Sequence, residues 1–255
     1  MTPRQSILVH ACCASCSSHV LSQLASSYDV TAYFYNPNVQ PESEYRLRLD
    51  EMRRLTELLG VRLIEGDYRT LRWWKEVWPL RRLPERSERC WACYRHRFEM
   101  AARKAAELSI PLFTSTLSVS PHKVFERIAA IGEEVGREHG VAFLAEDFKK
   151  RDGFKKSVEF ARQYDLARQD YCGCLMSRIE ADERRSGRRG QLHGRAVRVA
   201  SPAGQQPQRR RGGDRQNAVR AVDCSGSDVD GADEDALGVE VVQSGHHPDD
   251  VGDRV

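Results

Sequence analysis

Cysteine thiols are the side chains of this chain most able to do chemistry, because a thiolate is both a nucleophile and a soft metal ligand. Seven of the eight cysteines gather into three short groups, all at predicted loop or loop–helix positions. This arrangement indicates one shared metal or redox site. The groups are Cys12, Cys13 and Cys16, then Cys90-Trp-Ala-Cys93, then Cys172-Gly-Cys174.

The spacing of the thiols is compatible with three kinds of chemistry. Four thiolates complete a closed tetrahedral zinc site. Seven thiols exceed that number, which favours an iron–sulfur cluster, whereas Cys90 and Cys93 alone could exchange disulfides as in thioredoxin. Cys172 and Cys174 flank a glycine and could close a strained, easily reduced disulfide ring or bind a second metal ion. The residues by themselves leave these alternatives open.

The composition indicates a cytoplasmic protein. No run of about 18 apolar residues exists, so we expect no transmembrane helix. The apolar stretch Ser6–Val9 is too short for a signal peptide. In the cytosol, thiols are more often metal ligands or redox groups than structural disulfides. The formal net charge of +3 is compatible with a nucleic-acid partner but is not diagnostic of one.

An α/β fold must position these thiols, since short apolar runs alternate with segments of helical period. Such alternation predicts a parallel sheet with helices on both faces. Ligands of such sheets lie outside the carboxyl ends of the strands, where Cys12 and Cys13 follow the first strand. We expect strands at Ser6–Val9, Val30–Tyr35, Val61–Glu65, Pro111–Ser115 and Val141–Leu144, and helices from Ser15 or Ser17 to about Ser26 and at Glu44–Leu59, Leu71–Trp78, Cys90–Leu108, His122–Glu138 and Phe154–Tyr164.

The C-terminal part of the chain differs in kind from the rest. No lysine follows Lys156, and no aromatic residue follows Tyr171. Gly187–Val255 has almost no leucine or isoleucine and no sustained period, so it cannot bury enough apolar surface to fold. We therefore expect a catalytic domain over residues 1–178 and a low-complexity tail over residues 179–255. The tail is either disordered or a frame-shift product.

Further motifs accompany the cysteines in order over about residues 5–178. They are His10–Ser17, Tyr35-Asn-Pro-Asn38 with Glu44 and Tyr45, Gly66-Asp-Tyr68, Cys90–Arg95, Thr114–Lys123, Asp147–Lys150 with Gly153, and Gln169–Cys174. With these motifs the chain resembles the epoxyqueuosine reductases of the QueH type. The segment after residue 178 matches none of them, which supports the frame shift.

The resemblance implies a cytosolic enzyme that reduces epoxyqueuosine to queuosine at the wobble position of tRNA. Its fold would be a Rossmann-like, nucleotide α-hydrolase-like sheet. It would carry a [4Fe–4S] cluster and no cobalamin, and an external donor (ferredoxin, flavodoxin or a thiol reductant) would supply electrons. By position, the cluster ligands would be Cys12, Cys13, Cys90 and Cys93, with Cys16 as an alternative ligand, and Cys172 and Cys174 would be a redox pair or hold an additional iron or zinc ion.

Candidate proton donors and substrate contacts each have a structural alternative. His10, Asp67 and Asp147 are candidate donors, although the histidine could simply pack beside its strand and the aspartates could be turn or cap residues. Arginines near tryptophans suit a single-stranded RNA loop, although solvated helix faces explain them as well. The candidate substrate contacts are Asn36, Asn38, His122, Lys123 and Arg95.

Two rival functions remain in view. An ATP-dependent tRNA thiolase needs a glycine-rich phosphate loop after the first strand, and His10–Ser17 contains no glycine. A zinc-bound RNA-binding module without catalysis needs only four of the thiols. Metal analysis separates this second rival from the reductase, since the reductase would contain iron and sulfide.

Overall fold

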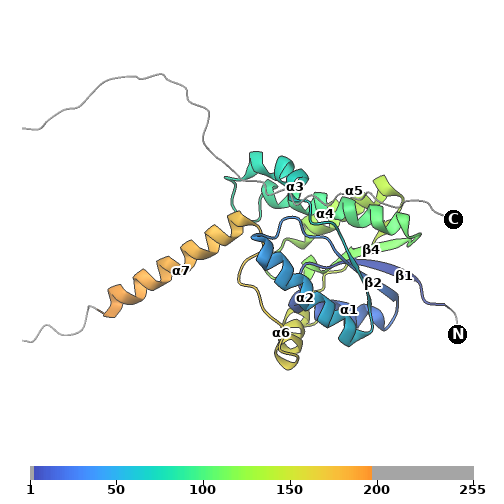
Figure 1. The fold of residues 1–255 in the computed structure, drawn as a ribbon, viewed down its shortest axis with the longest axis horizontal. Coiled ribbons are helices and arrows are strands. Elements are labelled where there is room, and N and C mark those ends of the chain that lie inside the picture. The colour runs from blue at the N-terminus through green and yellow to red at the C-terminus, as the bar shows by residue number, and fades with distance from the viewer. Residues whose placement is uncertain (1–2, 197–255) are drawn as a thin grey trace, which may run out of the picture. The chain divides into compact units, whose positions relative to one another are not determined.

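The computed structural model describes residues 3–196, and within them the side chains of residues 3–187. A five-stranded parallel sheet with the order β3-β2-β1-β4-β5 forms its centre (Figure 1). The predicted α/β fold is confirmed. The strands are β1 (Ser6–His10), β2 (Asp29–Phe34), β3 (Arg62–Glu65), β4 (Leu112–Ser115) and β5 (Ala142–Phe143), and the helices that correspond to predictions are α1 (Ala14–Ala25), α2 (Glu42–Leu59), α3 (Thr70–Val77), α4 (Glu88–Glu107), α5 (Phe125–His139) and α6 (Gly153–Gln163).

The central strand β1 is buried on both faces, as its continuous apolar sequence requires. Ile7 and Val9 belong to the apolar cluster that includes residues of α1, α2 and α6. Leu8 points the other way, into the cluster built with α4 and α5. Figure 1 shows these two helix layers on opposite sides of the sheet.

The carboxyl ends of β1, β2 and β4 meet at one edge of the sheet. The register pairs His10 with Tyr33 on one side and with Ser115 on the other. The loop from β1 to α1 therefore lies beside the loops that follow β2 and β4. This edge is the usual ligand site of an open parallel sheet, and it receives the first cysteine group.

Helices α4 and α5 begin at different residues from those predicted. Helix α4 begins at Glu88, two residues before Cys90, and the Glu88 carboxylate in its first turn favours that start. Helix α5 begins at Phe125, so His122 and Lys123 lie in the preceding loop. A short 3₁₀ helix at Thr116–Val119, which no apolar period signals, connects β4 to that loop.

A seventh helix, α7 (Leu175–Ala196), crosses the domain boundary placed after residue 178. Its buried Ser177 and Ala181 anchor its first turns. The helix continues past Gly187 to Ala196, although this stretch shows no sustained apolar period. The remainder of the predicted tail, residues 197–255, lies outside the described residues.

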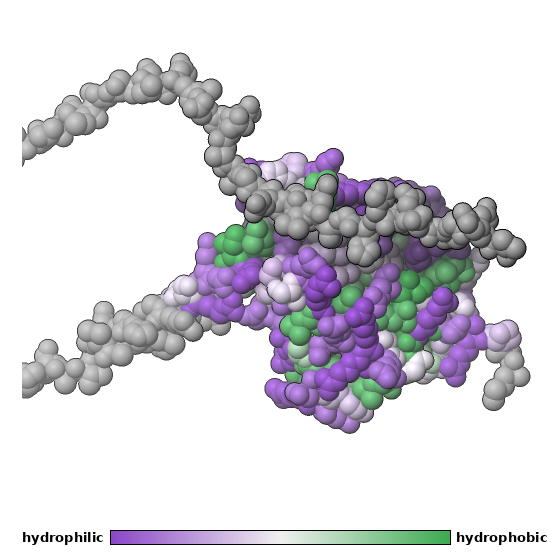
Figure 2. All heavy atoms as spheres, viewed as in Figure 1, coloured by the Kyte–Doolittle hydropathy of each residue, from purple (hydrophilic) through white to green (hydrophobic). Residues whose placement is uncertain are grey.

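Polar side chains dominate the surface of the described residues that Figure 2 shows, with smaller apolar patches among them. Larger apolar side chains on the surface include Leu71 and Trp78, near the two ends of α3. Within the described part of the chain, every helix is too short or too polar to cross a membrane.

Candidate active site

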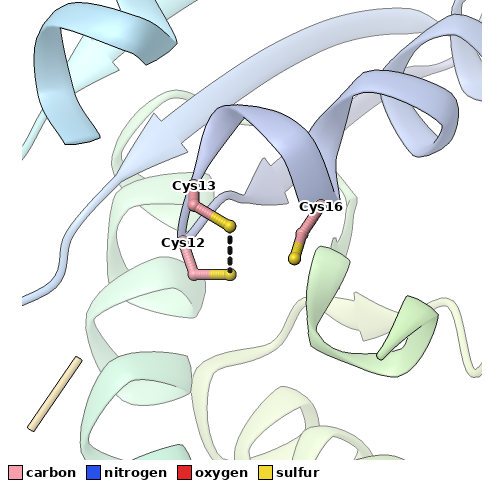
Figure 3. Close-up of side chains that lie close together, drawn as sticks. All are labelled: Cys12, Cys13 and Cys16. Atoms are coloured by element: carbon pink, nitrogen blue, oxygen red, sulfur yellow. Dashed lines mark hydrogen bonds between the residues drawn. The ribbon is translucent and has the colours of Figure 1, made fainter. Parts of the chain in front are cut away.

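The first cysteine group forms a compact triad at the start of α1. The chain leaves β1 at His10 and enters α1 at Ala14, so Cys12 and Cys13 lie in the connection and Cys16 on the first helical turn. Their three sulfurs lie within 4.8 Å of one another, and those of Cys12 and Cys13 are 3.9 Å apart (Figure 3). Tetrahedral thiolates on one zinc ion are about 3.8 Å apart. The triad is thus spaced closely enough to share a single ion.

The three thiols divide their protons unequally. The pKa of Cys12 is lowered well below its usual value, because hydrogen bonds from Cys13 and Cys16 outweigh the effect of burial. The same hydrogen bond raises the pKa of Cys13 to about 12, and the pKa of Cys16 is also raised. Deprotonation of the triad is therefore easiest at Cys12, and binding of a cation would release protons from the thiols.

The second and third cysteine groups come together around a small cavity of about 10 Å³. Cys90 and Cys93 are three residues apart on the first turns of α4, so both sulfurs leave the helix on the same side. Burial raises the pKa of Cys90, and burial followed by the charge of Cys172 raises the pKa of Cys174 to about 12. All four thiols are unbridged. The cavity joins residues separated by about 80 positions in sequence.

A larger cavity of about 620 Å³ opens over the first cysteine triad. Cys172 and Glu85 line both cavities, so Cys172 lies where they adjoin. Phe154 and Ser157 of α6 form part of the wall of the larger cavity, and within the described part of the chain the buried hydroxyl of Ser157 has no hydrogen-bond partner. Five basic residues contribute to its lining, namely Arg48, Arg86, Lys123, Arg168 and Arg184.

Buried cations surround the thiols. Arg97, Arg48 and Arg89 are each at most 3% exposed. Burial opposes the charge of Arg97, but the neighbouring Cys93, Cys172 and Cys12 raise its pKa. Its Nη2 atom has no hydrogen-bond partner among the described residues, and neither has the Nε atom of Arg89. Arg89 pairs with Glu180 at 2.9 Å and Arg48 with Glu44 at 2.8 Å, whereas Arg97 has no carboxylate partner among the described residues. Because an unpaired buried cation is costly, Arg97 favours an anion beside it.

An iron–sulfur cluster meets that requirement, because thiolates and the cluster they bind carry negative charge. Another buried donor lies at the same place: Trp73 Nε1, like Arg89 Nε, belongs to a residue that lines the small cavity and has no hydrogen-bond partner among the described residues. Cys93, Cys172 and Cys12 each raise the pKa of Arg97, so the charge of this guanidinium is felt both by the triad and by thiols of the second cavity. The donor set and its charges therefore fit an anionic metal cluster.

The candidate donor His10 is fully buried beneath the triad. Its Nδ1 atom lies 3.0 Å from the Ser115 hydroxyl, and its Nε2 atom donates to the Tyr35 carbonyl at 3.2 Å. Burial, and then the charge of Arg97, lower its pKa to about 3. A neutral ring with both nitrogens occupied holds the β1 end against β2 and β4, which is the packing alternative.

The two asparagines of the Tyr35–Asn38 motif are both buried, with different surroundings. Asn36 donates to the Ala11 carbonyl at 2.9 Å and accepts from Arg97, so it fixes the triad loop and that arginine. Asn38 lines the small cavity beside the cysteines. Only Asn38 has a side-chain atom at a cavity.

Lys123 lies at the site, but its contacts are within the protein. Its ammonium donates to Glu85 at 2.8 Å and to the Cys172 sulfur at 3.0 Å. Burial lowers the pKa of Lys123, yet the charges of Cys172 and Glu85 raise it well above its usual value. His122 lines the large cavity and is exposed.

Three candidate residues are not brought to either cavity. Asp67 is 78% exposed on its side chain and faces Arg69 at 3.6 Å. Asp147 accepts from the backbone N–H of Lys149, as a turn residue does. Arg95 lies on the outer side of α4, where its guanidinium pairs with Glu99, Glu134 and Glu138.

Several residues of the site were missed by sequence reasoning. Arg48, Arg97 and Glu85 carry charge and are usually exposed, so nothing in the pattern marks them as site residues. Arg97 does follow Cys93 by four residues, a helical spacing that places it on the same face. Phe154 and Ser157 have no signal beyond their place in a predicted helix.

The open parallel α/β sheet defines a Rossmann-like protein, and seven cysteines line two adjoining cavities of its site. Curated relatives share this chain's sequence: "Epoxyqueuosine reductase QueH" of Streptococcus pyogenes serotype M1 is 37% identical over 68% of this chain and 70% of its own length. The same-named protein of Histophilus somni is 36% identical over 67% of this chain and 71% of its own. The family described as "Epoxyqueuosine reductase QueH" matches residues 7–180, and the chain belongs to it, as the motifs predicted.

Among solved structures, a predicted subunit of a tRNA methyltransferase from Methanocaldococcus jannaschii aligns with a TM-score of 0.38 and 12% identity. The alignment covers 61% of this chain and 74% of that one. A similarity at this level has no bearing on function.

Proposed function

We propose that this protein reduces epoxyqueuosine to queuosine at the wobble position of tRNA, the last step of queuosine biosynthesis. Family membership over residues 7–180, together with the convergence of seven thiols near one edge of the sheet, carries the proposal. The reaction converts the epoxide to an alkene and releases its oxygen as water. It consumes two electrons and two protons.

In this proposal Cys12, Cys13, Cys90 and Cys93 hold a [4Fe–4S] cluster, with Cys16 as the alternative ligand. When bound, the cluster would relay electrons one at a time and offer an iron able to polarise an oxygen ligand. The buried guanidinium of Arg97 supports this assignment, because the charges of both Cys12 and Cys93 act on it and it would balance thiolates of both groups. Asn36 holds that guanidinium in place.

Cys172 and Cys174 are the redox pair. Oxidation of two thiols to one disulfide releases two electrons and two protons, which matches the demand of the epoxide. The position of Cys172 where the two cavities adjoin supports this role, because it is open to substrate and to an external reductant. Ferredoxin, flavodoxin or a small thiol would restore the dithiol. The alternative for this pair is an additional iron or zinc ion.

The large cavity is the substrate site. A volume of about 620 Å³ accommodates an extruded modified base, and the basic residues along it suit the phosphates of an anticodon loop. Phe154 offers an aromatic face and Ser157 a free hydroxyl to that base. A tRNA substrate places the activity in the cytoplasm.

Two variants test the assignment. Cys90→Ala removes a cluster ligand and should lower iron and sulfide content after anaerobic reconstitution. Cys172→Ala should keep the metal content and visible absorption but lose turnover. Retained activity in both variants would refute the site as drawn.

A second candidate follows from the close spacing of Cys12, Cys13 and Cys16, which suits one tetrahedral ion. A zinc-bound RNA-binding module without catalysis would use such a site. Zinc alone, with no iron after anaerobic reconstitution, would establish this candidate in place of the reductase.

A further inference from the structure

The loop that carries Cys172 and Cys174 is held in place by a buried arginine from another part of the fold. Arg48 of α2 is 2% exposed, and its Nε atom donates to Glu44 at 2.8 Å. Its Nη1 atom donates to the carbonyl of Cys172 at 3.1 Å, and its Nη2 atom to the carbonyl of Tyr171 at 3.3 Å. One guanidinium thus joins a helix to two consecutive peptide groups of the loop.

Every carbonyl from Tyr171 to Cys174 accepts a hydrogen bond. Arg48 supplies those to the first two, the backbone N–H of Gln40 donates to Gly173 at 2.9 Å, and Ser177 Oγ donates to Cys174 at 2.8 Å. The loop lies between α6 and α7 and has no helix or strand of its own. Its conformation therefore depends on these donors, and Arg48 supplies both of the hydrogen bonds to the peptide groups ahead of Gly173.

The close approach of the loop to Arg48 depends on Gly173. A Cβ atom at this position would lie 3.0 Å from Arg48 Nη1 and 3.0 Å from Val39 Cγ2. The backbone there has a φ of +127°, which side-chain-bearing residues rarely adopt. Glycine between the two cysteines thus lets the guanidinium reach the peptide of Cys172.

We propose that Arg48 is a positioning residue for the Cys172–Cys174 pair, an inference that rests on the proposed redox role of that pair. By fixing the two peptide groups ahead of Gly173, it restricts the backbone that carries both thiols. The free-energy cost of ordering the loop is met when the protein folds, so each oxidation needs little rearrangement. Lysine cannot replace it, since one ammonium does not reproduce a planar fork directed at three acceptors.

Helix α2 offers a matched control. Arg54 lies on the same helix and also donates to two consecutive carbonyls, those of Tyr164 at 2.8 Å and Asp165 at 3.1 Å. These carbonyls belong to the end of α6 and not to the cysteine loop. Arg54→Lys therefore makes the same chemical change on the same helix without touching the pair.

The test is the thiol–disulfide equilibrium of the pair in the full-length chain. The protein is equilibrated anaerobically with mixtures of reduced and oxidised glutathione: two thiols of the chain and one glutathione disulfide give one loop disulfide and two glutathione thiols. After alkylation, trypsin releases residues 169–178, which contain both cysteines, and mass spectrometry gives the oxidised fraction.

In Arg48→Lys we expect the equilibrium constant for disulfide formation to fall at least tenfold, a rise in reduction potential of about 30 mV. Arg54→Lys should match the unmodified chain. Glu44→Ala changes a partly exposed residue and frees the Nε end of Arg48, so it should lower the constant about threefold, by about 0.65 kcal/mol. This variant carries the test if Arg48→Lys does not fold.

An unchanged constant in Arg48→Lys, or in Glu44→Ala when the first variant does not fold, would overturn the positioning role. An equal fall in Arg54→Lys would overturn it as well, because the effect would then come from the helix. If the unmodified chain forms no loop disulfide at any glutathione ratio, the redox pair of the proposed function fails, and this inference fails with it. The two failures are therefore distinguishable.

Discussion

Replacing Gly173 by alanine tests whether the cysteine loop has the backbone conformation described. At φ +127° a side chain costs about 1–3 kcal/mol in strain. The new methyl group would also lie 3.0 Å from both Arg48 Nη1 and Val39 Cγ2, which adds about 1 kcal/mol of crowding. We expect Gly173→Ala to lower the free energy of unfolding by about 3 kcal/mol in total.

Gly60 provides the comparison for that variant. It ends α2 with a φ of +63°, and nothing lies within 4 Å of a Cβ atom built there. Gly60→Ala should therefore cost only the left-handed strain, about 1 kcal/mol. Urea unfolding followed by circular dichroism should separate the two variants by about 1 M in midpoint. A midpoint for Gly173→Ala equal to or above that of Gly60→Ala would refute the conformation assigned to the loop.

Three further predictions concern charges. Glu85→Gln leaves the buried Lys123 without its carboxylate and should lower the free energy of unfolding by about 2 kcal/mol at neutral pH. Burial raises the pKa of Glu85, but the opposing effect of Lys123 is larger, so the pKa lies below the ordinary carboxyl value. The stabilisation is therefore present above that ordinary value and is lost as the pH falls through the lowered pKa, where the denaturant curves of the two proteins should converge. Replacing Arg168 and Arg184 by alanine should weaken tRNA binding and reduce the salt slope by about 2, and an unchanged slope would exclude this rim as a phosphate contact. Arg95→Ala should leave turnover unchanged, since its partners lie outside the site, and lost turnover with intact folding would place it in the site after all.

The sheet was predictable because its strands are short apolar runs. Ser6–His10 and Asp29–Phe34 are buried on both faces, so their sequences are nearly continuous apolar runs of strand length rather than alternating ones. The position of Cys12 and Cys13 was predictable too, because they directly follow a recognisable strand. A parallel sheet places loops at the carboxyl ends of its strands at one edge, so their convergence follows from topology alone.

The charged part of the site was not predictable from residue type. Arginine and lysine are usually exposed, and only tertiary structure shows that Arg48, Arg97 and Lys123 are buried beside thiols. Lys123 in particular was expected to contact substrate, whereas its ammonium is paired with Glu85 and Cys172. The sequence pattern does not specify which distant side chain satisfies a buried charge.

Two candidate site residues, Asp67 and Arg95, lie away from the cavities, and local geometry explains both positions. Asp67 comes directly after β3 but its side chain points into solvent, because Gly66 packs against Tyr33 and Tyr35 and leaves the aspartate on the outside of the turn. Arg95 follows Cys93 by two residues, a spacing that places it on a different face of α4. Proximity in sequence to a thiol does not imply proximity to the site.

The most direct measurement of the central claim is turnover of the native substrate. The full chain, reconstituted anaerobically with iron and sulfide, is incubated with tRNA that carries epoxyqueuosine and with a low-potential reductant. Digestion of the tRNA and mass spectrometry of its nucleosides then report the product. The proposal predicts formation of queuosine, about 16 Da lighter than its precursor through loss of one oxygen atom. The amount formed should rise in proportion to bound iron. Unchanged epoxyqueuosine with a fully iron-loaded protein would contradict it.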